Sequence, residues 1–214
     1  MTSATRVPPA EITGVYGAVL KRVSRKMLGD VPDSLGILWH HRPVLRFSLG
    51  LGMRSSRWKA CDEDLKSYAH MAVASLVGCS FCLDLGYFEA HNKGLDLTKA
   101  SAIPRWRESD VFTPLERDVL EYAEAMSQTP PTVTDDLSAR LLDALGAPAL
   151  IELTAWVALA NQYARSNVAL GIEAAGLAAS CGLTPLTPRS QPGRPQPATT
   201  QPAGTQPGRV ASPA

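Results

Sequence analysis

Two helical patterns meet at a pair of cysteines in this 214-residue chain. In residues 62–77 the apolar side chains recur every three or four positions, which predicts an amphipathic helix, and Gly78 is a residue that commonly ends one. A second helical pattern covers residues 81–92. Cys79 and Cys82 lie between the two patterns with the spacing Cys-x-x-Cys, so we expect both at the start of the second helix.

This spacing fits three kinds of site. Two thiols three residues apart can close a small disulfide ring, and the helix dipole lowers the pKa of an exposed thiolate at a helix N-terminus. Two thiols are also half of a zinc site, which would need further ligands from Cys61, His70, Cys181 or a second subunit. No second Cys-x-x-Cys and no His-x-x-x-His occurs, so we expect no metal. In the third interpretation the cysteines are merely buried.

The rest of the chain repeats the helical period, and no alternating strand pattern of useful length occurs, which predicts an all-α domain. The expected helices cover residues 10–28, 33–39, 44–53, 62–77, 81–92, 114–127, 137–145 and 148–179. The first is expected to turn one apolar face inward, made of Ile12, Val15, Tyr16, Val19, Leu20, Val23 and Met27. The last is rich in alanine, which suits a central helix or a subunit interface.

Composition and charge divide the chain into three parts. We expect a flexible arm at residues 1–9, one helical domain at 10–182, and a disordered tail at 183–214 that is rich in proline. The formal net charge of +1 gives no indication of nucleic acid or of an anionic membrane as a partner. We identify no transmembrane stretch and no signal peptide, and therefore expect a cytoplasmic protein in which thiols are mostly reduced.

Residues 62–94, with Leu-Val-Gly-Cys-Ser-Phe-Cys-Leu-Asp-Leu-Gly at their centre, resemble the AhpD-like/carboxymuconolactone decarboxylase family. The similarity extends through His41-Arg42-Pro43 and through the stretch that ends at Ser166-Asn167, over roughly residues 10–180. The resemblance implies a bundle of about six to eight helices, assembled as a homo-oligomer, commonly a trimer or hexamer. It also implies reduction of alkyl hydroperoxides without a cofactor, with electrons from a dithiol or from a lipoylated or thioredoxin-like reductant.

By the same resemblance, Cys82 is the peroxidatic cysteine and Cys79 the resolving one. Three positions depart from the redox members of the family. Ser67 stands where they have a glutamate twelve residues before the first cysteine, and Phe81 and Gly86 stand where histidines occur.

One residue could replace the missing proton-handling groups. His70 follows Ser67 by three positions, so both share a face of the predicted helix, and we predict His70 as the general base. We expect Asp84 to favour the start of the second helix and His91 to be exposed.

The first hypothesis is therefore a thiol-dependent peroxidase or disulfide reductase. The alternatives are a non-catalytic member of the family, acting as a redox sensor or an oligomeric interaction module, and a decarboxylase of the carboxymuconolactone type.

Overall fold

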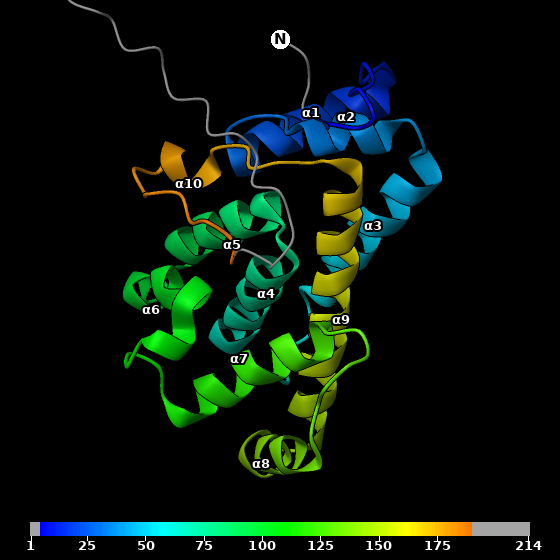
Figure 1. Cartoon of the computed structure of the whole chain (residues 1–214). Coiled ribbons are helices and arrows are strands. Elements are labelled where there is room, and N and C mark those ends of the chain that lie inside the picture. Colours follow the sequence, from blue (N-terminus) through cyan, green and yellow to red (C-terminus); the bar gives the residue numbers. More distant parts are fainter. Residues whose placement is uncertain (1–4, 190–214) are drawn as a thin grey trace, which may run out of the picture.

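The computed structural model describes residues 5–189, and within this range the chain is all-α, as predicted. Ten α-helices and one 3-10 helix, η1, make up the described part (Figure 1). In chain order they are α1 (Gly14–Leu28), α2 (Asp33–Trp39), α3 (Arg42–Ser55), α4 (Glu63–Val77), α5 (Ser80–Lys93), α6 (Leu97–Ala102), η1 (Ile103–Glu108), α7 (Pro114–Ser127), α8 (Asp135–Leu145), α9 (Ala147–Leu170) and α10 (Leu177–Ser180). The count exceeds the expected six to eight because α6 and α10 are too short to show a helical period in the sequence.

Helix α4 lies in the middle of the domain and packs against α5, α7 and α9 (Figure 1). The side chain of Asp62 caps its start by accepting the N–H groups of Asp64 and Leu65 at 2.8 and 3.2 Å. Gly78 ends it with a left-handed φ of +80°, which glycine adopts without strain. Ten of the fifteen residues of α4 are buried, so the cysteines that follow it are fixed to the core of the domain.

The alanine-rich helix α9 ends nine residues earlier than predicted, at Leu170 instead of residue 179. Gly171 turns the chain with a φ of +70°, and the N–H groups of Gly171 and Ile172 bond to the carbonyl of Asn167. The small apolar residues continue beyond this turn, which is why periodicity alone missed it. The chain instead runs on as an irregular segment, residues 172–176, into the short helix α10.

The predicted orientation of α1 is wrong. Val15 is 85% exposed and Met27 is 68% exposed, and Gly17 is the buried residue of the helix. A Cβ atom at Gly17 would lie 2.8 Å from Ile12 and 3.1 Å from Trp39, so α1 approaches the rest of the molecule through its glycine side. Ile12, just before α1, forms a small cluster with Leu35 and Trp39 of α2 and Leu45 of α3, and Leu20 of α1 packs against it. The apolar stripe of α1 is therefore left facing outward.

The packed domain extends beyond the predicted limits of residues 10 and 182. Arg6 donates a hydrogen bond from its guanidinium to the carbonyl of Ala169 at 2.7 Å, and Val7 packs against the core. After residue 182, Leu186 packs against the core and the backbone N–H of Arg189 bonds to the carbonyl of Ser75 at 3.1 Å. The rest of the predicted arm and tail, residues 1–4 and 190–214, lies outside the described residues. No helix between residues 5 and 189 has the length and apolarity needed to cross a membrane.

Candidate functional site

The two cysteines of the Cys-x-x-Cys spacing lie at the start of α5 and form a disulfide, with 5.3 Å between their Cα atoms. Cys79 is the N-cap residue of the helix, and its Sγ accepts the backbone N–H of Cys82 at 3.1 Å. The side chains are 0% and 3% exposed, respectively. The structure therefore confirms the predicted helix start and the pairing of the two sulfurs, in a place where water has little access.

A third residue touches the sulfurs, and it comes from a distant part of the chain. The side-chain amide nitrogen of Asn167, near the end of α9, lies 3.3 Å from Sγ of Cys82 and 3.9 Å from Sγ of Cys79. Sequence reasoning assigned no role to Asn167. The available signal was its place as the last residue of the family-like stretch, Ser166-Asn167, within the predicted helix of residues 148–179.

His70, the predicted base, lies on α4 and is half-buried. Burial lowers the pKa of its imidazole, while the carboxylate of Glu89 and a polar interaction with the backbone of Cys82 act in the opposite direction. The net effect keeps the ring neutral near pH 7, the form that can accept a proton. The structure thus brings His70 to the backbone of Cys82, whereas the hydrogen bonds given to the sulfurs by described residues come from Asn167 and from the N–H of Cys82.

Gly86 shows why the imidazole comes from α4 and not from α5. A Cβ atom at Gly86 would lie 2.8 Å from Cγ of Met71 and 3.5 Å from Cδ2 of His70. Any side chain at this position, including the histidine found in redox members of the family, would displace Met71. The ring of His70 lies beside this backbone position, so an imidazole from α4 is next to α5.

Two polar residues of the motif region hold the segment that follows α9. The hydroxyl of Ser80 accepts the N–H of Ala174 at 3.1 Å. The buried carboxylate of Asp84 accepts three N–H groups of residues 175–178, at 3.1, 2.9 and 2.9 Å. Asp84 therefore acts at a helix start, as expected of a carboxylate, but the helix is α10 and not α5. Ser80 and Asp84 fasten residues 174–178 against α5.

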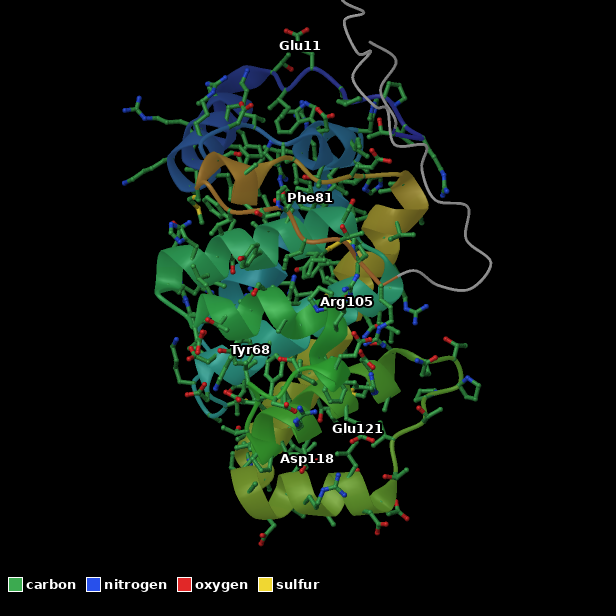
Figure 2. All side chains as sticks on the ribbon, turned by 60° about the vertical axis from the view of Figure 1, so that its left-hand side comes forward. Glu11, Tyr68, Phe81, Arg105, Asp118 and Glu121 are labelled. Carbon is green, nitrogen blue, oxygen red and sulfur yellow. A yellow bond between two sulfur atoms is a disulfide. The ribbon has the colours of Figure 1, made fainter. Side chains whose placement is uncertain are left out.

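A cavity of about 210 Å³ borders this segment. Phe81, which stands between the two cysteines, forms one wall, and residues 30–34 and 172–177 form the others. Figure 2 shows Phe81 on the side of α5 that faces the N-terminal helices. Three carboxylates, those of Asp30, Asp33 and Glu173, belong to the lining residues, so the cavity is acidic.

The remaining candidates are not part of this site. Cys61 is buried, and burial together with the nearby carboxylate of Glu152 raises the pKa of its thiol to about 11. Cys181 is a free, half-buried thiol after α10, and His91 is exposed as expected. Between residues 5 and 189, no three His, Cys, Asp or Glu side chains come together as ligands for a metal ion. The raised pKa keeps the thiol of Cys61 protonated near neutral pH, so Cys61 is a poor nucleophile.

Comparison with protein families matches residues 45–125 to the carboxymuconolactone decarboxylase family. Two curated relatives have no assigned activity. Protein YnjA of Escherichia coli (strain K12) is 37% identical over 141 residues, which are 65% of this chain and 78% of that protein. Protein YdfG of Bacillus subtilis (strain 168) is 27% identical over 121 residues, which are 56% of this chain and 82% of that protein.

Solved structures share the fold. The debrominase Bmp8 superimposes with a TM-score of 0.71 at 21% identity, over 84% of this chain and 96% of its own. A peroxidase-related protein with an AhpD core from Ralstonia eutropha JMP134 gives 0.70 at 13% identity, over 81% and 94%. ATU0492 of Agrobacterium tumefaciens, described as a putative antioxidant defence protein AhpD, gives 0.61 at 19% identity, over 64% and 94%. At these identities the likeness shows the AhpD-like fold, and the named activities differ among proteins that share it.

Proposed function

The chain belongs to the carboxymuconolactone decarboxylase family, and from this premise we propose that it is a thiol-dependent peroxidase in which Cys82 attacks a hydroperoxide and Cys79 resolves the product. The observation that carries the proposal is the pair of sulfurs at the start of α5, close enough to be bonded, with a side-chain amide donor 3.3 Å from Cys82. Such a pair can donate two electrons and store the oxidised state as a disulfide.

The reaction consists of two displacements at sulfur and oxygen. The Cys82 thiolate attacks the terminal oxygen of the hydroperoxide, so that an S–O bond forms, the O–O bond breaks and an alkoxide leaves and is protonated to the alcohol. Cys82 is now a sulfenic acid. The Cys79 thiolate then attacks the sulfur of Cys82, the S–S bond forms and the S–O bond breaks, and the departing hydroxide takes a proton to become water. One hydroperoxide and two thiols give one alcohol, one water and one disulfide.

His70 is the base in this scheme. A free thiol of pKa ~8.5 is only a few per cent ionised near neutral pH, so an acceptor for the Cys82 proton increases the rate. Because burial lowers the pKa of His70, its ring is neutral and able to accept that proton. After the attack, the protonated ring returns the proton to the leaving alkoxide. His70 thereby takes the part of the family histidine that Gly86 replaces.

The disulfide must be reduced to complete the cycle, and we propose a dithiol as the source of electrons, either a lipoylated or a thioredoxin-like protein. Both sulfurs are buried, and residues 174–178 are held against α5 by Ser80 and Asp84. Because both sulfurs are buried, we expect reduction to require local opening around the start of α5, so that an attacking thiolate can reach one of the sulfurs. A reducing cytoplasm is the compartment in which such a cycle can run.

We also propose that copies of the chain associate through the outward face of α1 and α3. Val15, Val19 and Met27 of α1 and Phe47 of α3 are exposed, and the two helices meet where Arg46 lies over the ring of Tyr16 at 5.4 Å. Several large apolar side chains left exposed favour an interaction site. Residues 5–57 contain nine Lys and Arg and three Asp and Glu, which gives a net charge of +6. Residues 58–189 contain ten Lys and Arg and seventeen Asp and Glu, which gives a net charge of −7. The opposite charges favour contact between the N-terminal helices of one copy and the helical body of another.

A non-catalytic member of the family is the second candidate, favoured by Ser67, Phe81 and Gly86 at the proton-handling positions and by the burial of both sulfurs. Such a protein would form and release the disulfide without consuming peroxide catalytically. Purified protein supplied with cumene hydroperoxide and dithiothreitol separates the two. The proposed peroxidase consumes many equivalents of hydroperoxide and loses this turnover in Cys82→Ser, whereas with a non-catalytic member hydroperoxide is consumed no faster than by dithiothreitol alone. Retention of full turnover by Cys82→Ser would refute the proposed role of Cys82. A decarboxylase of the carboxymuconolactone type would decarboxylate its substrate at the same rate whether Cys82 is reduced or oxidised.

A further inference from the structure

The two sulfurs differ in the hydrogen bonds that they accept, and this bears on which thiol attacks. Cys79 is the N-cap residue of α5, and its Sγ accepts the N–H of Cys82 at 3.1 Å. Backbone N–H groups and the helix dipole at this place stabilise negative charge and lower the pKa of a thiol. The helix start by itself therefore favours a thiolate on Cys79, although the family resemblance assigns the attack to Cys82.

Cys82 has a donor of its own in Asn167. The amide nitrogen is 3.3 Å from Sγ of Cys82 and 3.9 Å from Sγ of Cys79, so its hydrogen bond is closer to the second cysteine. A thiolate can only accept hydrogen bonds, and therefore the amino end of the amide is the end that suits it. Because Cys82 is 3% exposed, water competes little for this bond, which makes it stronger than at the surface.

Asn167 is held where it is by the surrounding helices. Its backbone carbonyl accepts the N–H groups of Gly171 and Ile172, which close α9. Further back on α9, the indole N–H of Trp156 donates to the carbonyl of Lys66 at 2.9 Å and joins the helix to α4. The amide thus meets the sulfurs from a rigid element, as a preorganised donor should.

We propose that Asn167 is a catalytic residue that gives the attacking role to Cys82, by stabilising the thiolate of Cys82 in preference to that of Cys79. The inference rests on the proposed thiol chemistry, but it concerns ionisation of the reduced protein and can be tested without peroxide. It also removes the conflict between the helix start, which favours Cys79, and the attack by Cys82. The amide N–H stays on the nitrogen throughout, and the proton of Cys82 leaves to His70.

The test measures the pKa of each thiol separately, from the thiolate absorbance near 240 nm of reduced Cys79→Ser and Cys82→Ser proteins. The double variant supplies the background from Cys61 and Cys181. Adding Asn167→Leu, which has a similar size but no donor, should raise the pKa of Cys82 by about one unit, a tenfold loss of thiolate below the pKa. The pKa of Cys79 should change much less.

Gln162→Leu is the matched control, because it removes an amide from an exposed position of the same helix; it should leave both pKa values unchanged. Asn167→Asp is the second variant, for use also if Asn167→Leu fails to fold by circular dichroism. Its carboxylate should raise the pKa of Cys82 by about one to three units through like-charge repulsion. An unchanged pKa of Cys82 in the folded variants, or equal increases for Cys79 and Cys82, would overturn the proposal. If the protein proves not to be a peroxidase, the pKa difference still decides the role of Asn167 in ionisation.

Discussion

Replacing Asp84 with alanine should loosen the segment of residues 174–178 that packs on α5. The carboxylate is 5% exposed and accepts the N–H groups of Ala175, Leu177 and Ala178 at 3.1, 2.9 and 2.9 Å. A hydrogen bond to a charged group stabilises a protein by about 1.5–3 kcal/mol, and loss of a helix cap costs about 1 kcal/mol. Since the three bonds share one carboxylate and water can replace part of them, we expect the free energy of unfolding to fall by about 3 kcal/mol.

Two measurements check this prediction. Urea denaturation gives the free energy of unfolding, and hydrogen exchange of the amides of Ala175, Leu177 and Ala178 reports how often the segment opens. If about half of the loss is local to residues 174–178, exchange of these amides should accelerate roughly tenfold, because 1.4 kcal/mol corresponds to a factor of ten. Ser80→Ala is the matched control, since it removes one neutral bond to the same segment and should cost about 1 kcal/mol. Equal stability and equal exchange rates for Asp84→Ala and Ser80→Ala would refute the reasoning.

Three further predictions concern the base, the core and the surface. His70→Gln should lower kcat/KM about 10- to 30-fold at pH 7, and the deficit should shrink as the pH rises through the pKa of the Cys82 thiol, above which no base is needed; a deficit that is constant with pH would contradict it. Glu152→Gln removes the buried carboxylate partner of Lys66 at 2.7 Å and leaves the more exposed carboxylate of Glu63 at 3.1 Å, so it should cost about 3 kcal/mol in urea denaturation, the low end for a broken buried pair. Because the pKa of Glu152 is lowered in the folded protein, this stabilisation is present above the unfolded pKa near 4.3 and is lost at lower pH, so the two proteins should converge on acidification. Val19→Asp, at a 57% exposed position, should reduce the mass measured by light scattering after gel filtration without unfolding the chain, whereas an unchanged mass would remove α1 from the contact between copies.

The sequence predicted the helices around the cysteines well, because strong local signals mark their ends. Asp62 caps α4, Gly78 closes it, and Cys79 begins α5 directly afterwards. Where such signals compete with composition, the prediction was wrong: the alanines after Gly171 continue the apolar pattern, but the left-handed glycine and the bonds to Asn167 end the helix. At this point the left-handed backbone conformation and the hydrogen bonds that end a helix outweighed the apolar periodicity.

Other features depend on contacts between distant residues, which one sequence does not contain. Periodicity showed that α1 has an apolar face but could not show what covers it, and in the described chain that face points outward. Asn167 reaches Cys82 across 85 positions of sequence, so its role required the packing of α9. Periodicity placed His70 on α4 but could not show that its ring lies close to the backbone of Cys82, because this proximity depends on the packing of α4 against α5.

The proposed attack by Cys82 is tested most directly by finding which cysteine carries the first oxidation product. Reduced wild type, Cys79→Ser and Cys82→Ser are each mixed with one equivalent of cumene hydroperoxide, and sulfenic acid is trapped with dimedone and located by mass spectrometry. We expect a trapped sulfenic acid on Cys82 in the Cys79→Ser protein, a Cys79–Cys82 disulfide in wild type, and no rapid consumption of peroxide by Cys82→Ser. Sulfenic acid on Cys79 in Cys82→Ser, formed as fast as peroxide is consumed by wild type, would contradict the proposed attack by Cys82.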